Sequence, residues 1–509
     1  MSTFQGLELA KKALFAQRGG LYTTGHNIAN VNTEGYSRQR VNFETTTPFP
    51  VPSRVQPQIA GQMGTGVKIG TVQRIRDQFL DFQFRAENSR LGYWNTKQEA
   101  LSRMEELLNE PSANGMNNMM DRFWQSLQDL ADHPENSGAR SVVAQRGFAL
   151  AETYNHLSKS LQSIQADLKD QIDVSVKNIN SLLRQINGLN EQIQKIEPHG
   201  FLANDLYDER DRLIDKLSEH MNIKVHYSRS SESALEIADG IASIEVLDSR
   251  GHSIGDGVFL IDARSPNTVA NAVKEINVYP DNENSPITNI SVDGEDLGLD
   301  LMKSNGSLSA LIESFGYVDG DVKGTYPEML ADLDRMAAAF ANEFNRVHRQ
   351  GIDLNGDQPT IDFFIPKDGA TEITAESITI NPDILNNSDL IAAGDPDAGS
   401  RNADNALELA KVFENSLSDL GNTSTRKFFT ALIGELGVKG QEAKSEKESS
   451  EILQAQVSHS RMSVSAVSLD EEISNLIKFQ HAYNAAARSM TAIDELLDKI
   501  INQMGLVGR

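Results

Sequence analysis

The sequence predicts a mainly α-helical protein with inserted β-rich domains. In this α+β chain, long helices form a bundle, and coiled-coil-like helices with narrow apolar stripes lie at both ends. Three observations lead to this fold class. Apolar residues repeat at alternating spacings of three and four near both ends, helical patterns fill most of the middle, and two internal segments alternate as strands do. With 509 residues, of which 39% are apolar, the chain can form more than one domain and a sizeable core.

The N-terminal pattern predicts a helix that needs a partner. Most of its eight heptad positions are apolar: Leu7, Ala10, Leu14, Gln17, Leu21, Thr24, Ile28 and Val31. Gly19, Gly20 and Gly25 lie inside this helix, and each costs about 1 kcal/mol relative to Ala. Such a helix would be marginal alone in water. We expect it to end at Gly35, a residue type common just past helix ends.

The middle of the chain alternates between helical and strand-like patterns. Residues 45–78 predict extended chain or a small hairpin, and helices are predicted over 79–109, 139–196 and 205–221. Helix is also predicted over 305–350 and from Asn405 onward, with a break near Gly421–Ser424. These patterns define a helical bundle domain of 45–221, 305–350 and 403–464, a strand-rich outer domain of 222–304, and a strand-rich outer segment of 351–402.

The C-terminal pattern is the strongest. No Gly or Pro occurs from Gln441 to Met504, and a helix over 469–504 would be about 54 Å long. Its stripe is almost wholly apolar: Leu469, Glu472, Leu476, Phe479, Tyr483, Ala486, Met490, Ile493, Leu497, Ile500 and Met504. The two end helices have matching narrow stripes. We therefore expect 1–44 and 465–509 to form a terminal coiled-coil layer that is disordered in the monomer.

Charge is concentrated in the middle of the chain. The formal net charge of −25 argues against a nucleic-acid or anionic-membrane partner. Residues 222–310 carry 14 acidic and 6 basic side chains, net −8, and residues 351–408 carry 12 and 2, net −10. The chain ends are close to neutral. This distribution suits an object whose ends are buried and whose middle faces water.

Several absences narrow the classes of function. The chain has no Cys, which excludes disulfides and Cys-ligated zinc. No apolar run is long enough to insert into a membrane, and the N-terminus lacks the apolar core of a secretory signal peptide. The ten His residues form no metal-binding motif, so neither a metal nor another cofactor is expected. Taken alone, these features would suggest a cytoplasmic protein.

Five features of the sequence could indicate a functional site. Gly251-His-Ser253-Ile-Gly255 matches a hydrolase nucleophile elbow, but a second strand is predicted where the elbow needs a helix, so a hairpin loop is favoured. The Asp-rich segments 319–324 and 353–357 predict turns with at most weak cation binding. His26 has no acidic partner on its helix and is expected to be structural. A membrane-surface helix over 4–31 is disfavoured by Glu8 and the lack of Trp.

Asn27 and Asn30 are more informative than His26. They lie three residues apart on one side of the N-terminal helix, although Asn is a poor helix former. If the helix is buried in an assembly, their amides should pair across helices. A solvated face is the alternative.

Four motifs resemble those of the flagellar axial family of rod, hook and hook-associated proteins. The N-terminal "TTGHNIANVNTEGYSRQRV" and the C-terminal "SVSAVSLDEEISNLIKFQHAYNAAARSMTAIDELLDKIINQMG" are similar to the family's terminal motifs. The internal "NDLYDERDRLIDKLSE" (204–219) and "FNRVHRQGIDLNGD" (344–357) resemble hook-associated members. The sequence departs from the family at Glu34, where many members have Pro, and at Ala466-Val-Ser468, where many have Gly-x-Asn.

The resemblance implies a structural adaptor, not an enzyme, that joins hook to filament by axial polymerisation. Its expected partners are copies of itself in a ring or helical assembly, the hook protein, a second junction protein or the filament, and a cytoplasmic export chaperone at the C-terminal helix. It would be extracellular, at the hook–filament junction, and secreted by the flagellar type III apparatus without a cleaved signal peptide. This overturns the cytoplasmic expectation.

The resemblance also places the assembly interface on both terminal helices. The residues expected there are Leu7, Leu14, Leu21, Asn27, Ile28, Asn30, Val31, Leu469, Leu476, Phe479, Tyr483, Met490, Ile493 and Leu497. The alternatives are another axial protein of hook or distal-rod type, a cytoplasmic coiled-coil scaffold, and a Ser hydrolase using Ser253.

Overall fold

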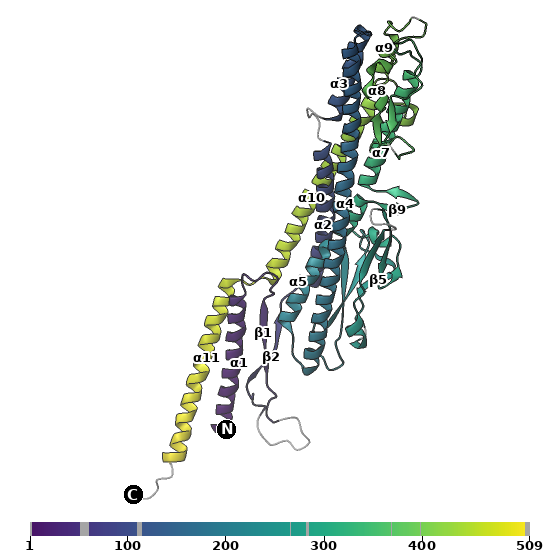
Figure 1. Ribbon diagram of the computed structural model, residues 1–509. Coiled ribbons are helices and arrows are strands. Elements are labelled where there is room, and N and C mark those ends of the chain that lie inside the picture. Colours follow the sequence, from purple (N-terminus) through teal and green to yellow (C-terminus); the bar gives the residue numbers. More distant parts are fainter. Residues whose placement is uncertain are drawn as a thin grey trace.

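The computed structural model describes residues 3–50, 61–108, 115–264, 266–280, 285–367, 369–397 and 399–503. The molecule is elongated. A helical body carries β-rich parts along one side, and both chain ends extend beyond one end of the body as a pair of helices (Figure 1). This confirms the predicted fold class, mainly α with inserted β-rich domains.

The spine of the body is α4 (Ser137–Ile196), a helix of 60 residues and therefore about 90 Å long. The Asn136 side chain caps its start by accepting hydrogen bonds from the backbone N–H groups of Gly138 and Ala139. Buried residues recur every three or four positions along most of its length. A helix buried in this way can serve as the surface on which the other layers pack.

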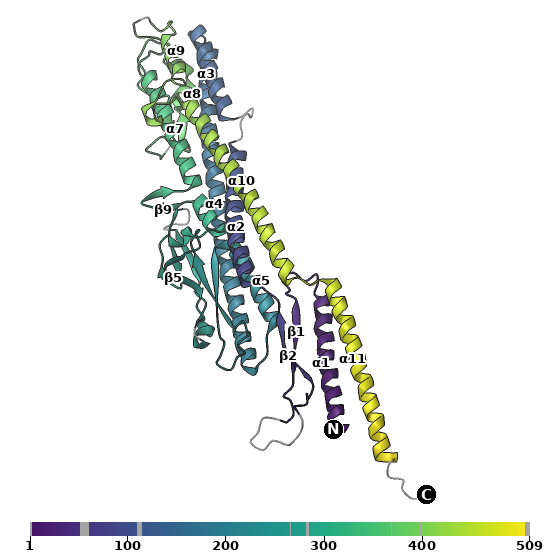
Figure 2. The ribbon, with the colours of Figure 1, turned by 180° about the vertical axis from the view of Figure 1, so that it is seen from behind.

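Three further helices run along this spine. They are α2 (Gln78–Leu107), α5 (Asn204–His220) and α10 (Thr425–Ser465), and α10 crosses α2 on the face seen in Figure 2. The predicted helices 79–109, 139–196 and 205–221 are confirmed to within a few residues. The helix predicted from Asn405 is broken over a longer stretch than expected. A helix α9 (Asp404–Lys411) and a short turn η5 (Ser418–Leu420) precede α10, because Gly421 and Asn422 both adopt positive φ.

One helix was missed in the sequence. Helix α3 (Met116–Asp132) lies in a stretch where we predicted no helix, and it packs against α4. Its buried face repeats at helical spacing through Met116, Met120, Phe123, Leu127 and Leu130. This is an amphipathic pattern, with apolar residues at helical spacing and polar residues between them, so the prediction was wrong to leave this stretch without a helix.

The predicted strand-rich domain contains two sheets. Strands β3 (Ile223–Ser228), β4 (Ile241–Leu247) and β5 (Ser253–Ile261) form an antiparallel sheet in that order. The strands of the second sheet are β6 (Ile276–Pro280), β7 (Ile287–Val292), β8 (Glu295–Asp296), β9 (Tyr317–Asp319) and β10 (Asp321–Lys323). They lie in the order β10-β9-β7-β6, with β8 paired to β7. Short turns η2 (Pro266–Asn271) and η3 (Asp300–Lys303) connect these strands.

Strands β9 and β10 correct the prediction of continuous helix over 305–350. They form a hairpin between α6 (Ser307–Phe315) and α7 (Thr325–His348). Gly316 and Gly324 flank the hairpin with φ of 123° and 133°, a backbone conformation that ends a helix and that suits Gly. The strand-rich domain therefore includes part of the segment assigned to the bundle.

Asparagine side chains attach this domain to the spine. Asn180 of α4 donates to the carbonyl of Ile276 and accepts from its N–H, both at 2.9 Å. Asn190 makes the same double contact with Ala242 of β4, at 2.9 and 3.1 Å. These amides satisfy backbone groups that a neighbouring strand would otherwise bind.

The far end of the body has an aromatic core. Here α7 contacts β11 (Phe364–Pro366) and α9, while β12 (Ile378–Ile380), α8 (Pro382–Asn386) and the turn η4 (Ser388–Leu390) pack on α4. Six Phe rings from these and adjoining elements pack together: Phe123, Phe340, Phe344, Phe363, Phe364 and Phe413. The prediction that 351–402 contains strands and turns is confirmed for its short two-stranded sheet.

The terminal elements lie beyond the other end of the body. Helices α1 (Thr3–Ala29) and α11 (Leu469–Asp498) lie side by side in both ribbon views, and α11 continues into a π-turn, η6 (Lys499–Gln503). Met504, the last position of the predicted stripe, lies outside the described residues. An antiparallel hairpin of β1 (Gln39–Thr45) and β2 (Val67–Arg74) packs on α1. The prediction of extended chain or a hairpin over 45–78 is confirmed for β2, but the hairpin begins earlier, at Gln39, and packs with the terminal helices instead of the bundle to which 45–78 is assigned.

In the part of the chain that the structure describes, we find no helix both long and apolar enough to cross a membrane.

Candidate assembly interface

The contact between α1 and α11 depends on glycine. A Cβ added to Gly20 would lie 3.1 Å from the Phe479 ring, and one added to Gly6 would lie 3.2 Å from Cδ1 of Ile493. On another side of α1, Gly19 faces Ile69 of β2. Gly19 and Gly20, which weaken the isolated helix, are thus positions of close packing, whereas a Cβ added to Gly25 would meet no neighbour within 4 Å.

The apolar residues predicted for α1 occupy the flanks of its buried surface. Leu7, Leu14, Leu21 and Ile28 are half-buried. The fully buried positions hold smaller side chains: Ala10, Ala16, Thr23, Thr24 and Asn27. Small residues at these positions let neighbouring elements approach the α1 backbone closely, and the larger residues lie around them.

The predicted positions on α11 are more exposed. Leu476, Phe479, Met490 and Ile493 are half-buried and Leu497 is buried, whereas Leu469 and Tyr483 are exposed. Phe479 also packs edge-on against Phe43 of β1, with ring centroids 5.7 Å apart. The prediction that the two end helices pair with each other is confirmed, and Phe479 joins the pair to the hairpin.

Asn27 has its partners within its own chain, which corrects the expected cross-helix pairing. Its amide donates to the carbonyl of Gln39 at 2.8 Å, and its oxygen accepts from the Gln39 N–H at 3.0 Å and from the Tyr36 hydroxyl at 2.7 Å. Burial, followed by the charges of Asp205 and Asp208, raises the pKa of Tyr36, so this hydroxyl stays a donor. Asn27 therefore fixes the turn that leads from α1 into β1.

Asn30 and Val31 lie beyond the end of the helix. We had expected α1 to continue to Gly35, but it ends at Ala29, and the Asn30 amide donates to the carbonyl of His26 at 3.0 Å. Gly35 has a φ of 81° within the turn that follows. His26 lies 3.1 Å from the Tyr36 hydroxyl, which gives it the structural role expected for it.

Large apolar side chains remain exposed along the terminal pair. On α1 they are Phe4, Leu9, Phe15 and Tyr22, of which Tyr22 is 77% exposed. On α11 and η6 they are Leu469, Ile473, Ile477, Tyr483, Leu496, Ile500 and Ile501. So many large exposed apolar side chains on two paired helices exceed the scattered single residues normal on a monomer, which favours an interaction site.

Arg38 connects the terminal pair to the body. Its backbone N–H donates to the carbonyl of Ser465 at the end of α10, and its carbonyl accepts from Ile75 just after β2, at 2.9 and 2.7 Å. Its guanidinium binds two carboxylates at the start of α11, Glu471 at 2.8 Å and Glu472 at 2.7 Å. Arg38 therefore contacts both segments through which the chain passes between the body and the terminal pair, one just after β2 and the other at the end of α10.

An acidic ladder on α5 lies next to this connection. Asp208, Asp211 and Asp215 share one face of the helix, and four arginines from other elements converge on them: Arg74, Arg76, Arg85 and Arg461. Burial alone would raise the pKa of Asp211, but the surrounding arginines hold it well below its usual range. The pKa of Asp208 is raised, because burial outweighs Arg74. Charge pairing thus holds the base of the body together.

This ladder lies within the motif 204–219, which the sequence linked to hook-associated proteins. The spacing of its acidic residues places them on one helix face. Their partners are far away in sequence, since Arg74 and Asp208 are 134 positions apart. Sequence inspection could find the ladder but not the arginines.

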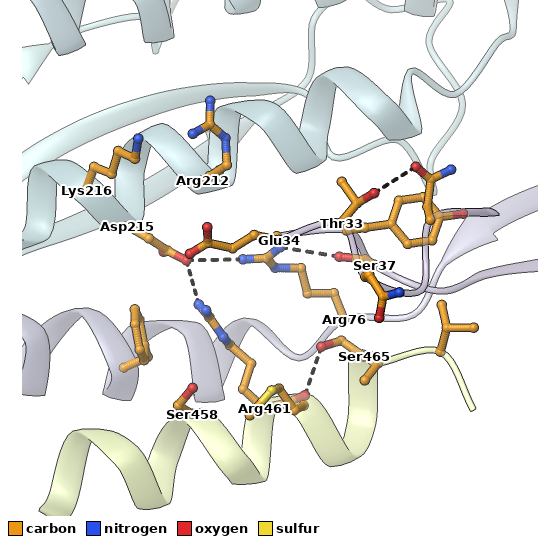
Figure 3. Close-up of a pocket in the computed structure, with 18 of the residues that line it drawn as sticks. Thr33, Glu34, Ser37, Arg76, Arg212, Asp215, Lys216, Ser458, Arg461 and Ser465 are labelled. Carbon is orange, nitrogen blue, oxygen red and sulfur yellow. Dashed lines mark hydrogen bonds and ion pairs between the residues drawn. The ribbon is translucent and has the colours of Figure 1, made fainter. Parts of the chain in front are cut away.

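A cavity of about 570 Å³ opens beside the ladder (Figure 3). It lies between the turn after α1, helices α2 and α5, and the end of α10, and Arg76 and Arg461 both point towards Asp215 within it. Arg461 lies 2.5 Å from Asp215, and its guanidinium covers the Phe84 ring at 3.9 Å from the centroid. The cavity marks where the chain passes from body to terminal pair.

Comparison with known proteins identifies the family of this chain. Residues 101–364 match a family model described as the flagellar hook-associated protein FlgK helical domain. The chain is 45% identical to flagellar hook-associated protein 1 of Bacillus subtilis (strain 168) over the full length of both proteins. The chain belongs to the flagellar hook-associated protein 1 family.

More distant relatives agree with this assignment. Flagellar hook-associated protein 1 of Escherichia coli (strain K12) is 24% identical, with 97% of this chain and 98% of that one covered. Residues 459–504, which include α11, match a model described as flagellar basal body rod FlgEFG protein C-terminal. The flagellar hook junction protein FlgK from Burkholderia pseudomallei shares the fold, with a TM-score of 0.56 and 13% identity over 75% of this chain and all of that one.

As a hook-associated family member, the protein is a structural component of the bacterial flagellum. The matches are to hook-associated protein 1 over nearly the whole chain, so the alternatives of hook protein and distal-rod protein are not supported. The terminal-motif resemblance to the wider axial family is confirmed at the C-terminus.

Ser253 lacks the surroundings of a hydrolase nucleophile. It is the exposed first residue of β5, so a strand follows it where the elbow motif requires a helix. Although burial raises the pKa of Glu245, hydrogen bonds from Ser253 and His226 outweigh it and lower that pKa. The carboxylate thus lies between the hydroxyl and the imidazole, whereas a triad needs the imidazole next to the hydroxyl.

The Asp-rich segments form closed turns. Asp319 pairs with Lys323 at 2.7 Å across the β9–β10 hairpin. Asp353 accepts hydrogen bonds from the Asp357 N–H at 2.9 Å and the Asn355 amide at 3.2 Å. Within the described ranges, no group of three or more His, Asp or Glu side chains is arranged to hold a metal ion.

Proposed function

We propose that this protein joins hook to filament by axial polymerisation through α1 and α11. The observation that carries the proposal is the set of large apolar side chains left exposed on the terminal pair, from Phe4 to Tyr22 on α1 and from Leu469 to Ile501 at the C-terminal end. Burying such a surface between copies favours assembly by about 25 cal/mol for each Å² removed from water. The partners are copies of the same chain, the hook protein, and a second junction protein or the filament.

In the proposed assembly the terminal pair forms the inner layer. The helical body forms the next layer, and the acidic β-rich parts face outward, where like charges remain solvated. The helices α1 and α11 become fully ordered only in the assembly, because each has too little buried surface of its own in the monomer. Arg38 anchors the base of the pair in both states.

The proposal includes an extracellular location. The chain leaves the cell through the flagellar type III apparatus without a cleaved signal peptide. Before export, a cytoplasmic chaperone covers α11, because its exposed apolar residues would otherwise promote aggregation. We further propose that the protein has no catalytic activity, since the strongest enzyme-like motif, at Ser253, lacks an adjacent base.

Immunogold labelling of purified flagella tests the function directly. The protein should lie at the boundary between hook and filament. Cells lacking it should release filament protein into the medium while still forming hooks. Labelling elsewhere on the flagellum, or firmly attached filaments in cells lacking the protein, would overturn the proposal.

A further inference from the structure

A groove lies between β2 and the loop that joins α4 to α5. Its volume is about 830 Å³, and its lining includes Ile69, Val72, Ile196, Phe201, Leu206 and Leu235. Three of these side chains are exposed, Phe201 by 67% and Ile69 and Leu235 by 37% each. The turn η1 (Glu197–His199) shapes this end of the body, where α4 stops.

One acidic side chain lines the groove, and two more lie close to it in sequence. Asp205, the second residue of α5, lines the groove, is exposed and accepts a hydrogen bond from the Gln39 amide at 2.9 Å. Glu232 and Glu236 lie three positions before and one after Leu235, and both are exposed. An apolar floor with an acidic rim suits a partner that presents large apolar side chains next to cations.

One face of α1 has this chemistry. Helix α11 covers α1 at Gly6 and Gly20, and the hairpin covers it at Lys12 and Gly19. The remaining face carries exposed Phe4, Lys11, Phe15, Arg18 and Tyr22, whose separations are close to whole numbers of helical turns. The Arg18 guanidinium lies 5.1 Å from the Phe15 ring centroid, so rings and cations form a single surface.

Within one molecule these two surfaces do not meet. The hairpin contacts α1 through Gly19 and Lys12, which lie on a different face from Phe15 and Tyr22. Pairing of two α1 faces with each other would bring Lys11 and Arg18 close to their own copies, which like-charge repulsion disfavours. A groove on another copy satisfies both the apolar and the charged groups.

We propose that the aromatic–basic face of α1 (Phe4, Lys11, Phe15, Arg18 and Tyr22) docks into the acid-rimmed groove at Phe201 and Leu235 of the next copy. The two patches differ, so the contact is heterologous and repeats from copy to copy, producing a ring or an open helix. The inference rests on the proposed axial polymerisation and identifies the surfaces that would carry it.

Cysteine cross-linking tests this contact cleanly, because the chain has no Cys of its own. Two double variants, Tyr22→Cys/Phe201→Cys and Phe15→Cys/Leu235→Cys, would be produced in cells that lack the wild-type protein. Purified flagella would then be treated with a short bismaleimide and analysed by denaturing electrophoresis. A heterologous contact should give a ladder of covalent multimers in at least one double variant and only monomers in each single variant.

Matched controls separate the possible outcomes. Tyr22→Cys combined with Val322→Cys, which places a thiol on the exposed outer hairpin, should give no ladder. Dimers from Tyr22→Cys alone would mean that α1 faces pack on each other and would overturn the inference. The absence of a ladder in variants that occupy the junction would also overturn it. If both double variants purify as folded monomers but fail to assemble while the Val322→Cys control assembles, the two surfaces are required for the contact.

Failure of the inference and failure of the proposed function remain distinguishable. Junctions that contain the protein but give no ladder contradict only the docking of α1 into the groove. Absence of the wild-type protein from purified flagella contradicts axial polymerisation itself.

Discussion

Arg38 and Glu472 form an ion pair across the boundary between the body and the terminal helices, with Nε of Arg38 2.7 Å from Oε1 of Glu472. Glu472 is only 2% exposed, so its carboxylate has little water to replace the guanidinium. The neighbouring pair with Glu471 differs, because the side chain of Glu471 is 57% exposed. The buried pair therefore fixes the start of α11 more firmly than the exposed one.

Replacing Arg38 should release α11 from the body. Arg38→Met keeps much of the apolar stem but leaves the buried Glu472 without a partner, at a cost of about 3 kcal/mol. That cost corresponds to a roughly 100-fold shift in the equilibrium between attached and released α11. Limited proteolysis of the dilute monomer, followed by mass spectrometry, should show much faster cleavage at Ala466–Ser468 than in the wild type.

Glu471→Gln is the matched control for this variant. An exposed ion pair contributes about 1 kcal/mol or less, so cleavage at the same linker should rise by less than about fivefold. In the wild type, protease should trim α1 and α11 from their free ends and stop near Arg38, leaving the body intact. Equal cleavage rates in Arg38→Met and Glu471→Gln would show that Arg38 does not anchor the pair.

Ser253→Ala should leave the protein working normally. The hydroxyl is exposed and donates one hydrogen bond to Glu245, so its loss should change the free energy of unfolding by no more than about 1 kcal/mol. Swimming speed and filament attachment should match those of the wild type. An ester-hydrolysis assay on both proteins completes the test, and activity lost only in the variant would restore the hydrolase hypothesis.

His348 should make the body less stable in mild acid. Burial lowers its pKa to about 4, and its Nε2 accepts a hydrogen bond from the Ala392 N–H at 3.1 Å. Unfolded, the same side chain has a pKa near 6.5. Between these values the unfolded chain binds a proton that the folded chain does not, so the free energy of unfolding falls by about 3 kcal/mol as pH drops from 7 to 4.

Chemical denaturation at several pH values measures this loss. His348→Gln keeps an acceptor for Ala392 but removes the titrating group, so its stability should depend less on pH over the same range. His252→Gln is a suitable control, because the His252 side chain is 75% exposed. The same pH dependence in wild type and His348→Gln would show that the buried imidazole is not responsible.

Features that depend on local periodicity were predictable from the sequence. The pairing of α1 with α11, the spine α4 and the strands after Ile223 all follow from repeats of three to four or two residues. Residues with positive φ explain two places where a predicted helix is interrupted for longer than expected. Gly324 divides the helix predicted over 305–350, and Asn422 extends the break before α10.

Features that depend on distant partners were not predictable. Asn27 was correctly expected to need hydrogen-bond partners, but these are Tyr36 and the backbone of Gln39 rather than another helix. The arginines facing the α5 ladder come from the end of β2 and the residues just after it, from α2 and from α10. Only the folded chain brings Arg461 within 2.5 Å of Asp215, across 246 positions.

The final prediction separates folding from assembly. Leu476 is half-buried on α11, whereas Leu183 is fully buried in the spine α4. A charge at Leu183 cannot be solvated in the monomer, so Leu183→Asp should lower the melting temperature sharply. In contrast, Leu476→Asp should purify as a folded monomer with a near-normal melting temperature, because α11 contributes little to the core of the body.

In the assembled junction the same Asp at position 476 would be buried without a partner, at a cost of several kcal/mol. Cells producing Leu476→Asp should therefore make hooks but release filament protein into the medium. Export must be measured alongside, by assaying the variant itself in the medium, because loss of the proposed chaperone contact at α11 would stop the protein before assembly. If Leu476→Asp lowers the melting temperature as much as Leu183→Asp, then α11 already belongs to the folded core of the monomer. The division between a stable body and ends that become ordered on assembly would then be wrong.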